Sequence, residues 1–160
     1  MIKKYKIIPL LVSLSLPFLA GSIGSYFTFP AINSWYKTLE KPFFSPPNWV
    51  FGPVWTLLYI FMGISLYLIY TSDTKNIEKS KGLKVFFIQL ALNSLWSIAF
   101  FGLKSPLTAL VIILVLWALI LLTIKYFMKI NKAAGWLLIP YLAWVSFATI
   151  LNSSIVVLNP

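Results

Sequence analysis

The sequence of 160 residues contains no cysteine, no histidine and no arginine, and its acidic residues are only Glu40, Asp73 and Glu78. The lack of cysteine excludes disulfides and thiolate chemistry. The lack of histidine removes the commonest general base and the commonest metal and haem ligand. We therefore expect no resident metal or cofactor, and no site for conventional acid–base or hydrolytic catalysis. Charged residues make up 10% of the chain, against about 25% in soluble domains, which excludes a soluble globule.

The residues that are present are mainly apolar: 60% are hydrophobic, 18% are aromatic and the mean hydropathy is +0.90. The net charge of +10 comes from lysines grouped between long apolar runs. They form no basic helix face and offer no arginine fork for a base or phosphate, so we expect no nucleic-acid partner. Lysines that flank apolar runs are typical of the cytoplasmic edges of membrane proteins, which predicts the lipid bilayer as the surroundings.

Five stretches contain no Asp, Glu, Lys or Arg, and a helix of roughly 20 apolar residues spans a bilayer core. Runs such as Leu110–Leu122 are apolar on every side, as in helices, whereas strands of a β-barrel would alternate. The lysines before the first stretch also resemble a signal peptide, but its apolar run continues to Phe29, so we expect a retained helix. We predict an all-α integral membrane protein, one domain over 1–160, with helices near 7–27, 49–71, 83–103, 106–128 and 134–157.

Lysine positions predict the orientation in the membrane, because cytoplasmic loops are enriched in Lys and Arg. Ten lysines against three place the N-terminus inside and the C-terminus outside. Abundant lysine without arginine is also compatible with a low-GC bacterium, and so with a bacterial cell membrane. The inner set is Lys3, Lys4, Lys6, Lys75, Lys79, Lys81, Lys84, Lys125, Lys129 and Lys132, and the outer set is Lys37, Lys41 and Lys104.

The first connection, about residues 28–48, is long and rich in proline and aromatic residues, unlike the short polar connections that follow. Prolines such as Pro42 and Pro46 stiffen it by fixing φ. One interpretation is an aromatic belt at the membrane surface. The other is a semi-rigid lid packed across one mouth of the bundle, which we favour because long structured loops are often functional.

Aromatic, amide and hydroxyl groups recur at helical spacing inside the apolar stretches, whereas ionisable acids and bases are absent there. This absence argues against ion-coupled transporters and proton pumps. The aromatic faces could enclose a flat apolar cavity, or could be ordinary helix packing with the amides as interhelical hydrogen bonds. The three faces are Phe51, Trp55 and Tyr59; Asn93, Trp96 and Phe100; and Trp144, Ala148, Leu151 and Asn152.

Several motifs resemble those of the TspO/MBR family, the tryptophan-rich sensory proteins and the mitochondrial translocator (peripheral-type benzodiazepine receptor) proteins. They are WYKTLEKPFFSPPNWVFGPVWTLLYIFMG (Trp35–Gly63), QLALNSLW (Gln89–Trp96), FFG (Phe100–Gly102) and PYLAWVSFATILN (Pro140–Asn152). They occur in the family's order and cover nearly the whole chain. The resemblance implies a five-helix membrane receptor, commonly a homodimer, whose first loop caps a pocket for hydrophobic ligands.

The resemblance also implies the ligands and the pocket. Ligands of the family include porphyrins such as protoporphyrin IX and haem, and sterols in animal members. The chain lacks the aromatic and basic sterol segment after Asn152, so sterol binding by that motif is not expected. The implied ligand-binding residues are Trp35, Tyr36, Pro46, Phe51, Gly52, Val54, Trp55, Asn93, Phe100, Trp144, Ala148 and Leu151.

Three functions remain open from the sequence. The first, which we favour, is tetrapyrrole sensing, sequestration or transport by a binding protein. The second is light- and oxygen-dependent degradation of protoporphyrin IX, in which Trp55 and Trp144 would take part. The third is passive transport down a gradient.

Overall fold

The computed structural model describes residues 6–160, and the regular elements of this part of the chain are all helices, without strands. Lys3 and Lys4 lie outside the described residues. Five helical segments are long and apolar enough to cross a membrane, which confirms the predicted all-α membrane fold. The elements are α1 (Ile7–Ile32), the short α2 (Trp35–Thr38), α3 (Asn48–Tyr70), α4 (Ile77–Ser97) with its π-helical continuation η1 (Ile98–Gly102), α5 (Pro106–Ile130), α6 (Lys132–Leu137) and α7 (Ile139–Leu158).

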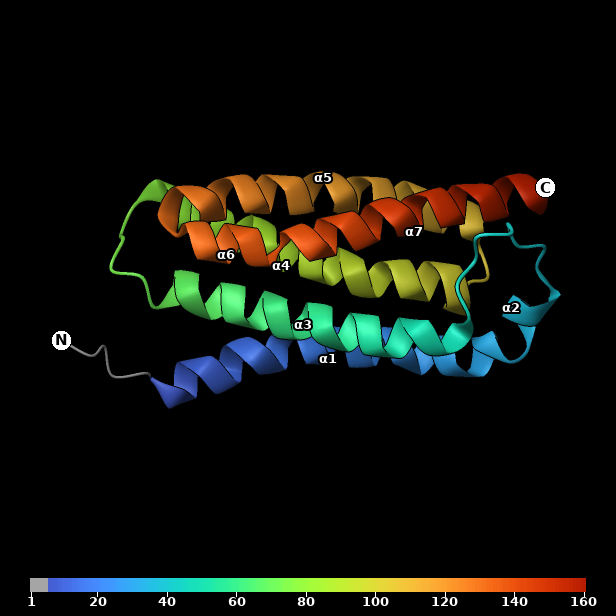
Figure 1. The fold of residues 1–160 in the computed structure, drawn as a ribbon, viewed down its shortest axis with the longest axis horizontal. Coiled ribbons are helices and arrows are strands. Elements are labelled where there is room, and N and C mark those ends of the chain that lie inside the picture. The colour runs from blue at the N-terminus through green and yellow to red at the C-terminus, as the bar shows by residue number, and fades with distance from the viewer. Residues whose placement is uncertain (1–5) are drawn as a thin grey trace.

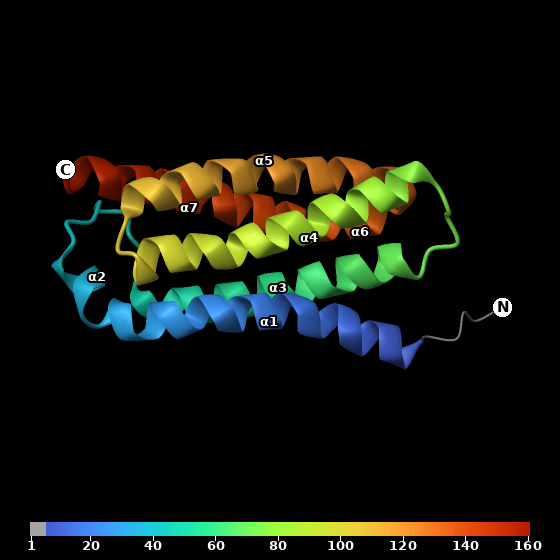
Figure 2. The same ribbon diagram turned by 180° about the vertical axis from the view of Figure 1, so that it is seen from behind.

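The long helices lie side by side along the long axis of the molecule (Figures 1 and 2). The start of α1, the α3–α4 connection and α6 lie at one end, which we call the lysine-rich end. The C-terminus and the first loop (residues 33–47, which includes α2) lie together at the opposite end (Figure 1). The described lysines of the predicted inner set therefore lie at the lysine-rich end, and those of the predicted outer set lie at the opposite end.

The third span begins earlier than predicted, at Ile77 and not near residue 83. Hydropathy alone placed the start after the lysines, but the side chain of Asn76 accepts a hydrogen bond from the Lys79 N–H at 3.0 Å. This N-cap satisfies a free donor of the first turn and starts the helix inside the charged segment. The first turns of α4 are therefore polar.

Two other helix boundaries differ from prediction. The first helix continues to Ile32, beyond residue 27, because the chain stays apolar until Asn33, the residue at its C-cap. The fifth span is interrupted at Leu138, between α6 and α7, with Pro140 in the first turn of α7. Proline lacks the N–H that would continue the helical ladder, and it is best accommodated in a first turn, where that N–H has no partner in the helix.

Small residues of α1 bring this helix close to α4. The Ser94 hydroxyl donates to the Ala20 carbonyl at 2.8 Å, and a Cβ built on Gly24 would lie 2.9 Å from the Ser97 hydroxyl oxygen. The small step from Ala20 to Gly24 therefore serves packing within one chain. Close backbone approach of this kind is typical of membrane helices.

The lysine-rich half of the bundle is densely packed. Met62, Ile69, Phe86, Ile120 and Phe127 are fully buried there, and the Phe86 and Phe127 rings stack at 5.7 Å. The opposite half, beneath the first loop, contains a cavity. The division places the solid core and the open site in different halves of the molecule.

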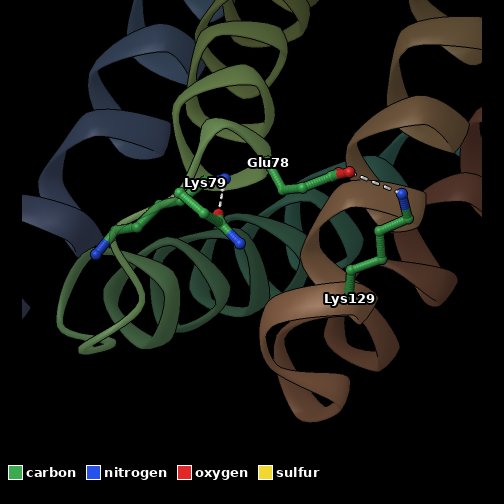
Figure 3. Close-up of polar contacts among 4 residues, drawn as sticks. Glu78, Lys79 and Lys129 are labelled. Carbon is green, nitrogen blue, oxygen red and sulfur yellow. Dashed lines mark hydrogen bonds and ion pairs between the residues drawn. The ribbon is translucent and has the colours of Figure 1, made fainter.

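An ion pair joins α4 to α5 at the lysine-rich end. Figure 3 shows the Glu78 side chain extending from α4 toward Lys129 of α5, and the two charged atoms lie 3.0 Å apart. Both side chains retain solvent exposure, 32% for Glu78 and 52% for Lys129. Exposed pairs of this kind contribute about 1 kcal/mol or less, so helix packing dominates the stability of this end.

Candidate functional site

A cavity of about 650 Å³ lies between α1, α3, α4 and α7 in the half of the bundle beneath the first loop. This volume is within the range of small-molecule sites, about 300–1,000 Å³. Aromatic side chains are the commonest kind in its wall, and amide, hydroxyl, glycine and aliphatic residues supply the rest. All the residues of the three faces expected from helical spacing line it: Phe51, Trp55, Tyr59, Asn93, Trp96, Phe100, Trp144, Ala148, Leu151 and Asn152.

The aromatic walls are held by ring-to-ring contacts. Trp55 stacks on Tyr59 with centroids 5.4 Å apart and 30° between the planes. Phe51 meets Trp144 edge to face at 5.9 Å, which joins the walls of α3 and α7. Aromatic pairs in these geometries contribute about 0.5–1.5 kcal/mol beyond their buried area. The rings are therefore fixed before any guest arrives.

Asn93 links three helices at the floor of the cavity. Its Oδ1 accepts from the Tyr59 hydroxyl at 3.2 Å, and its Nδ2 donates to the Tyr141 hydroxyl at 3.2 Å. The Tyr141 hydroxyl in turn donates to Gln89 Oε1 at 2.9 Å. These bonds join α3, α4 and α7 in an apolar interior, where an unpaired polar group would be unfavourable.

Asn152 makes a second polar link. Its Oδ1 accepts from the Trp96 indole N–H at 3.1 Å, and its Nδ2 donates to the Pro106 carbonyl at 2.9 Å. Pro106 begins α5, so the link ties α4, α5 and α7 together. The sequence left open whether the amides line a cavity or join helices. Asn93 and Asn152 do both.

The π-helical turn η1 places two consecutive rings on the same side. Phe100 and Phe101 both line the cavity, with centroids 4.8 Å apart. Both also approach Tyr36, at 6.2 Å and 5.7 Å. Successive residues of a regular α-helix point about 100° apart, and a π-turn changes that spacing; such turns are frequent at functional sites. The prediction assumed regular α-helical spacing and therefore did not include Phe101.

The wall formed by α1 was also missed. Ser22, Ser25 and Thr28 line the cavity from this helix, at a spacing that puts them on one helix face. These hydroxyl residues form a stripe that is visible in the sequence, but the prediction of the cavity used aromatic residues on three other helices. The Ser22 and Thr28 hydroxyls donate to carbonyls of their own helix, at 2.8 and 3.0 Å.

The cavity opens between the C-terminal part of α1 and the N-terminal part of α3. Lining residues from these segments are exposed, including Phe29 at 72% and Trp49 at 73%. A Cβ built on Gly52 would have no neighbour within 4 Å, whereas one on Gly63 would meet the Leu14 backbone at 2.8 Å. The two helices therefore touch near the lysine-rich end and diverge toward the first loop.

Tyr36 is a residue of the first loop that reaches the cavity, and its side chain is buried. Burial raises the pKa of the Tyr36 phenol above its usual value, and a hydrogen bond to Ser45 partly opposes the shift. The Lys41 ammonium lies 4.6 Å from the centre of the Tyr36 ring, within the range of a cation–π contact. Tyr36 thus attaches the first loop to the helices that enclose the cavity.

Three residues implied by the family resemblance do not line this cavity: Trp35, Pro46 and Val54. The Trp35 ring meets Phe100 at 5.7 Å, behind the wall. Val54 packs against the buried core, and Pro46 is a half-buried residue of the loop. The other implied residues line it: Tyr36, Phe51, Gly52, Trp55, Asn93, Phe100, Trp144, Ala148 and Leu151.

The tryptophans of the cavity differ in their hydrogen bonding. Trp96 donates its indole N–H to Asn152, whereas Trp55 and Trp144 have no side-chain hydrogen bond to another described residue. Buried indole N–H groups usually find a partner. The cavity wall therefore includes two indoles, Trp55 and Trp144, whose N–H groups are not donated to another described residue.

The fold and this geometry define an integral membrane protein of five spans with an aromatic cavity beneath its first loop. The chain matches the TspO/MBR family over residues 13–158 and belongs to that family. It is 47% identical to the tryptophan-rich protein TspO of Archaeoglobus fulgidus, over 96% of this chain and 98% of the relative. The TspO of Chlorobaculum tepidum is equally similar, at 47% over 97% and 98%. The translocator protein of Homo sapiens is 39% identical, over 85% of this chain and 81% of the relative.

Proposed function

We propose that this protein is a membrane receptor for flat hydrophobic molecules, most specifically tetrapyrroles such as protoporphyrin IX and haem. The observation that supports the proposal is the aromatic cavity of about 650 Å³ beneath the first loop. Ring faces of Trp55, Trp144 and Phe51 suit a planar guest, and the few polar groups would set its orientation. Binding would serve sensing, sequestration or transport of the tetrapyrrole.

Affinity would come from the macrocycle and not from a metal. The chain has no histidine and no cysteine, two of the usual axial ligands of haem. Tyrosine is another, but the hydroxyls of the cavity tyrosines Tyr36 and Tyr59 are hydrogen-bonded to Ser45 and Asn93. The indole donors of Trp55 and Trp144 are available for an acceptor on the guest. We accordingly expect protoporphyrin IX and haem to bind with similar affinity.

The test is a titration of tryptophan fluorescence with protoporphyrin IX in lipid nanodiscs. We expect saturable quenching with one guest per chain in the wild-type protein. Gly52→Leu would fill the open side of the cavity and weaken binding at least ten-fold, whereas Gly52→Ala, which adds one methyl group into free space, would bind nearly normally. Quenching that does not saturate, or that is the same in all three proteins, would refute the proposal.

Light-dependent degradation of the porphyrin is a second candidate, because Trp55 and Trp144 both line the cavity. The reaction would be an oxidation of the porphyrin by molecular oxygen under illumination, in which the porphyrin loses electrons, oxygen is reduced and the two tryptophans take part. Trp55→Phe and Trp144→Phe keep a ring at each position and remove the indole. Loss of porphyrin absorbance at the same rate with and without the indoles would identify incidental photobleaching.

Passive transport is a less favoured form of the proposal. The cavity residues belong to the half of the bundle nearer the first loop, and the densely packed core around Met62 and Phe86 separates them from the lysine-rich end. A guest would have to cross that core to traverse the chain. The proposal also includes a bacterial cell membrane with the lysine-rich end inside, and assembly as a homodimer.

A further inference from the structure

Asn159, the residue just after α7, hydrogen-bonds the main chain of the first loop. Its Oδ1 accepts from the Glu40 N–H at 3.0 Å, and its Nδ2 donates to the Glu40 carbonyl at 3.0 Å. The two residues are 119 positions apart in the sequence. The same Nδ2 also donates to the Ile155 carbonyl at 2.8 Å, which fixes the amide against its own helix.

We propose that Asn159 is a positioning residue that latches the first loop over the cavity, and so controls how fast a guest enters and leaves. The inference rests on the proposed function for the identity of the guest. The first loop leaves α1 at Asn33, meets the end of α7 at Glu40 and returns to α3 at Asn48. Asn33 and Asn48 also line the mouth of the cavity.

The latch adds to two apolar attachments of the same loop. Tyr36 is buried against Phe100 and Phe101, and Phe44 meets Phe147 of α7 edge to face at 6.3 Å. The rings attach both sides of the loop by burial, whereas Asn159 holds the middle by paired hydrogen bonds. Paired bonds to one peptide unit are directional, so they define one closed position.

The latch recognises backbone atoms, because both bonds use the peptide groups of residue 40. The Glu40 side chain is not required for them. Replacement of Glu40 by glutamine is therefore a matched control that changes the charge at the same position and keeps the latch. Replacement of Asn159 by alanine removes both bonds and leaves the loop sequence intact.

A latch has a kinetic signature that a ligand contact lacks. Asn159 does not line the cavity, so its bonds stabilise the closed loop equally with and without a guest. Their loss would speed opening in both states, and lids of this kind set the rates of entry and release. Because two hydrogen bonds are lost, we expect association and dissociation rates to rise together by about ten-fold, with little change in Kd.

The first experiment measures both rate constants by stopped-flow quenching of tryptophan fluorescence with protoporphyrin IX. We expect Asn159→Ala to raise both rates by similar factors, Asn159→Asp to show a smaller rise because it retains one acceptor, and Glu40→Gln to match the wild type. Unchanged rates in Asn159→Ala, or a change in Kd without a joint change in the rates, would overturn the inference.

A reversible lock tests the same point within one protein. The chain has no cysteine, so Glu40→Cys combined with Asn159→Cys introduces a single pair where the loop meets α7. We expect the oxidised protein to exchange porphyrin more slowly than the wild type, and reductant to release it. Exchange that is indifferent to oxidation of the pair would contradict the latch and would favour entry between α1 and α3.

A measurement without ligand separates this inference from the proposed function. Hydrogen–deuterium exchange over residues 33–47 should be faster in Asn159→Ala than in the wild type or Glu40→Gln. If porphyrin does not bind the wild-type protein but this exchange accelerates, the function fails and the latch stands. If exchange is unchanged, the latch fails whether or not porphyrin binds.

Discussion

Gly21 of α1 and Tyr59 of α3 lie in direct contact. A Cβ built on Gly21 would lie 2.6 Å from Cζ of the Tyr59 ring and 2.9 Å from its hydroxyl oxygen. The Tyr59 ring therefore occupies the space that a side chain at residue 21 would need. From that place Tyr59 stacks on Trp55 and donates to Asn93, so one glycine on α1 positions both an aromatic wall and a polar link.

We expect Gly21→Ala to destabilise the protein by about 1–3 kcal/mol, the range for overpacking of a filled site. The added methyl group would displace the Tyr59 ring and weaken its bond to Asn93. The measurement is thermal unfolding in detergent. Gly52→Ala is the matched control, and it should be neutral or stabilising by up to about 1 kcal/mol because its Cβ meets free space and alanine favours a helix. Equal effects of the two substitutions would contradict this packing.

The Tyr59–Asn93 bond is expected to contribute modestly to stability. Tyr59→Phe and Asn93→Leu each remove one partner, and a double-mutant cycle isolates the coupling between them. Coupling energies within membrane bundles average about 0.6 kcal/mol, so we expect about that value from equilibrium unfolding. The Asn93→Leu variant alone should lose more, because it also leaves the Tyr141 hydroxyl without one of its partners. Strictly additive effects would show that the bond is not formed in the bilayer.

The sequence was sufficient to predict the spans and much of the cavity. Charge-free runs gave five helices, and aromatic residues at helical spacing on α3, α4 and α7 all line the cavity. Periodicity works for these walls because each helix turns one face inward. It does not predict the depth of the space between the faces, which depends on how far α1 and α3 diverge near Gly52.

Two parts of the site were absent from the sequence-based prediction. Phe101 joins the cavity only because η1 departs from α-helical geometry, and no simple pattern signals a π-turn. The wall of α1 includes the small hydroxyl residues Ser22, Ser25 and Thr28 beside Phe18 and Phe29, and small hydroxyl residues on an apolar helix are not by themselves a sign of a ligand site. The resemblance also implied Trp35, whose ring lies behind Phe100 instead of at the surface of the cavity.

The pKa of the Tyr36 phenol should make the stability of the protein depend on pH in the alkaline range. Its pKa is raised in the folded protein, chiefly by burial, so folding favours the neutral phenol. Its contribution to stability should be complete below about pH 10, the unfolded pKa, and should fall as the pH rises through the folded pKa. We expect the wild-type melting temperature to fall more steeply above pH 10 than that of Tyr36→Phe. Parallel curves for the two proteins would show that Tyr36 is accessible to water.

The Glu78–Lys129 pair should matter little at physiological salt. Both side chains are partly exposed, so Lys129→Met should change the free energy of unfolding by about 1 kcal/mol or less. The small effect should shrink further in 1 M salt because the charges are screened. A loss of several kcal/mol would show instead that the carboxylate becomes a buried, unpaired charge when the lysine is removed.

The most direct test of the account is a structure of the protein in lipid with protoporphyrin IX bound. We expect one porphyrin inside the bundle, with its ring faces against Trp55 and Trp144 and the first loop closed above it. A porphyrin found only on the lipid-facing surface of the helices, with the cavity unchanged, would contradict it.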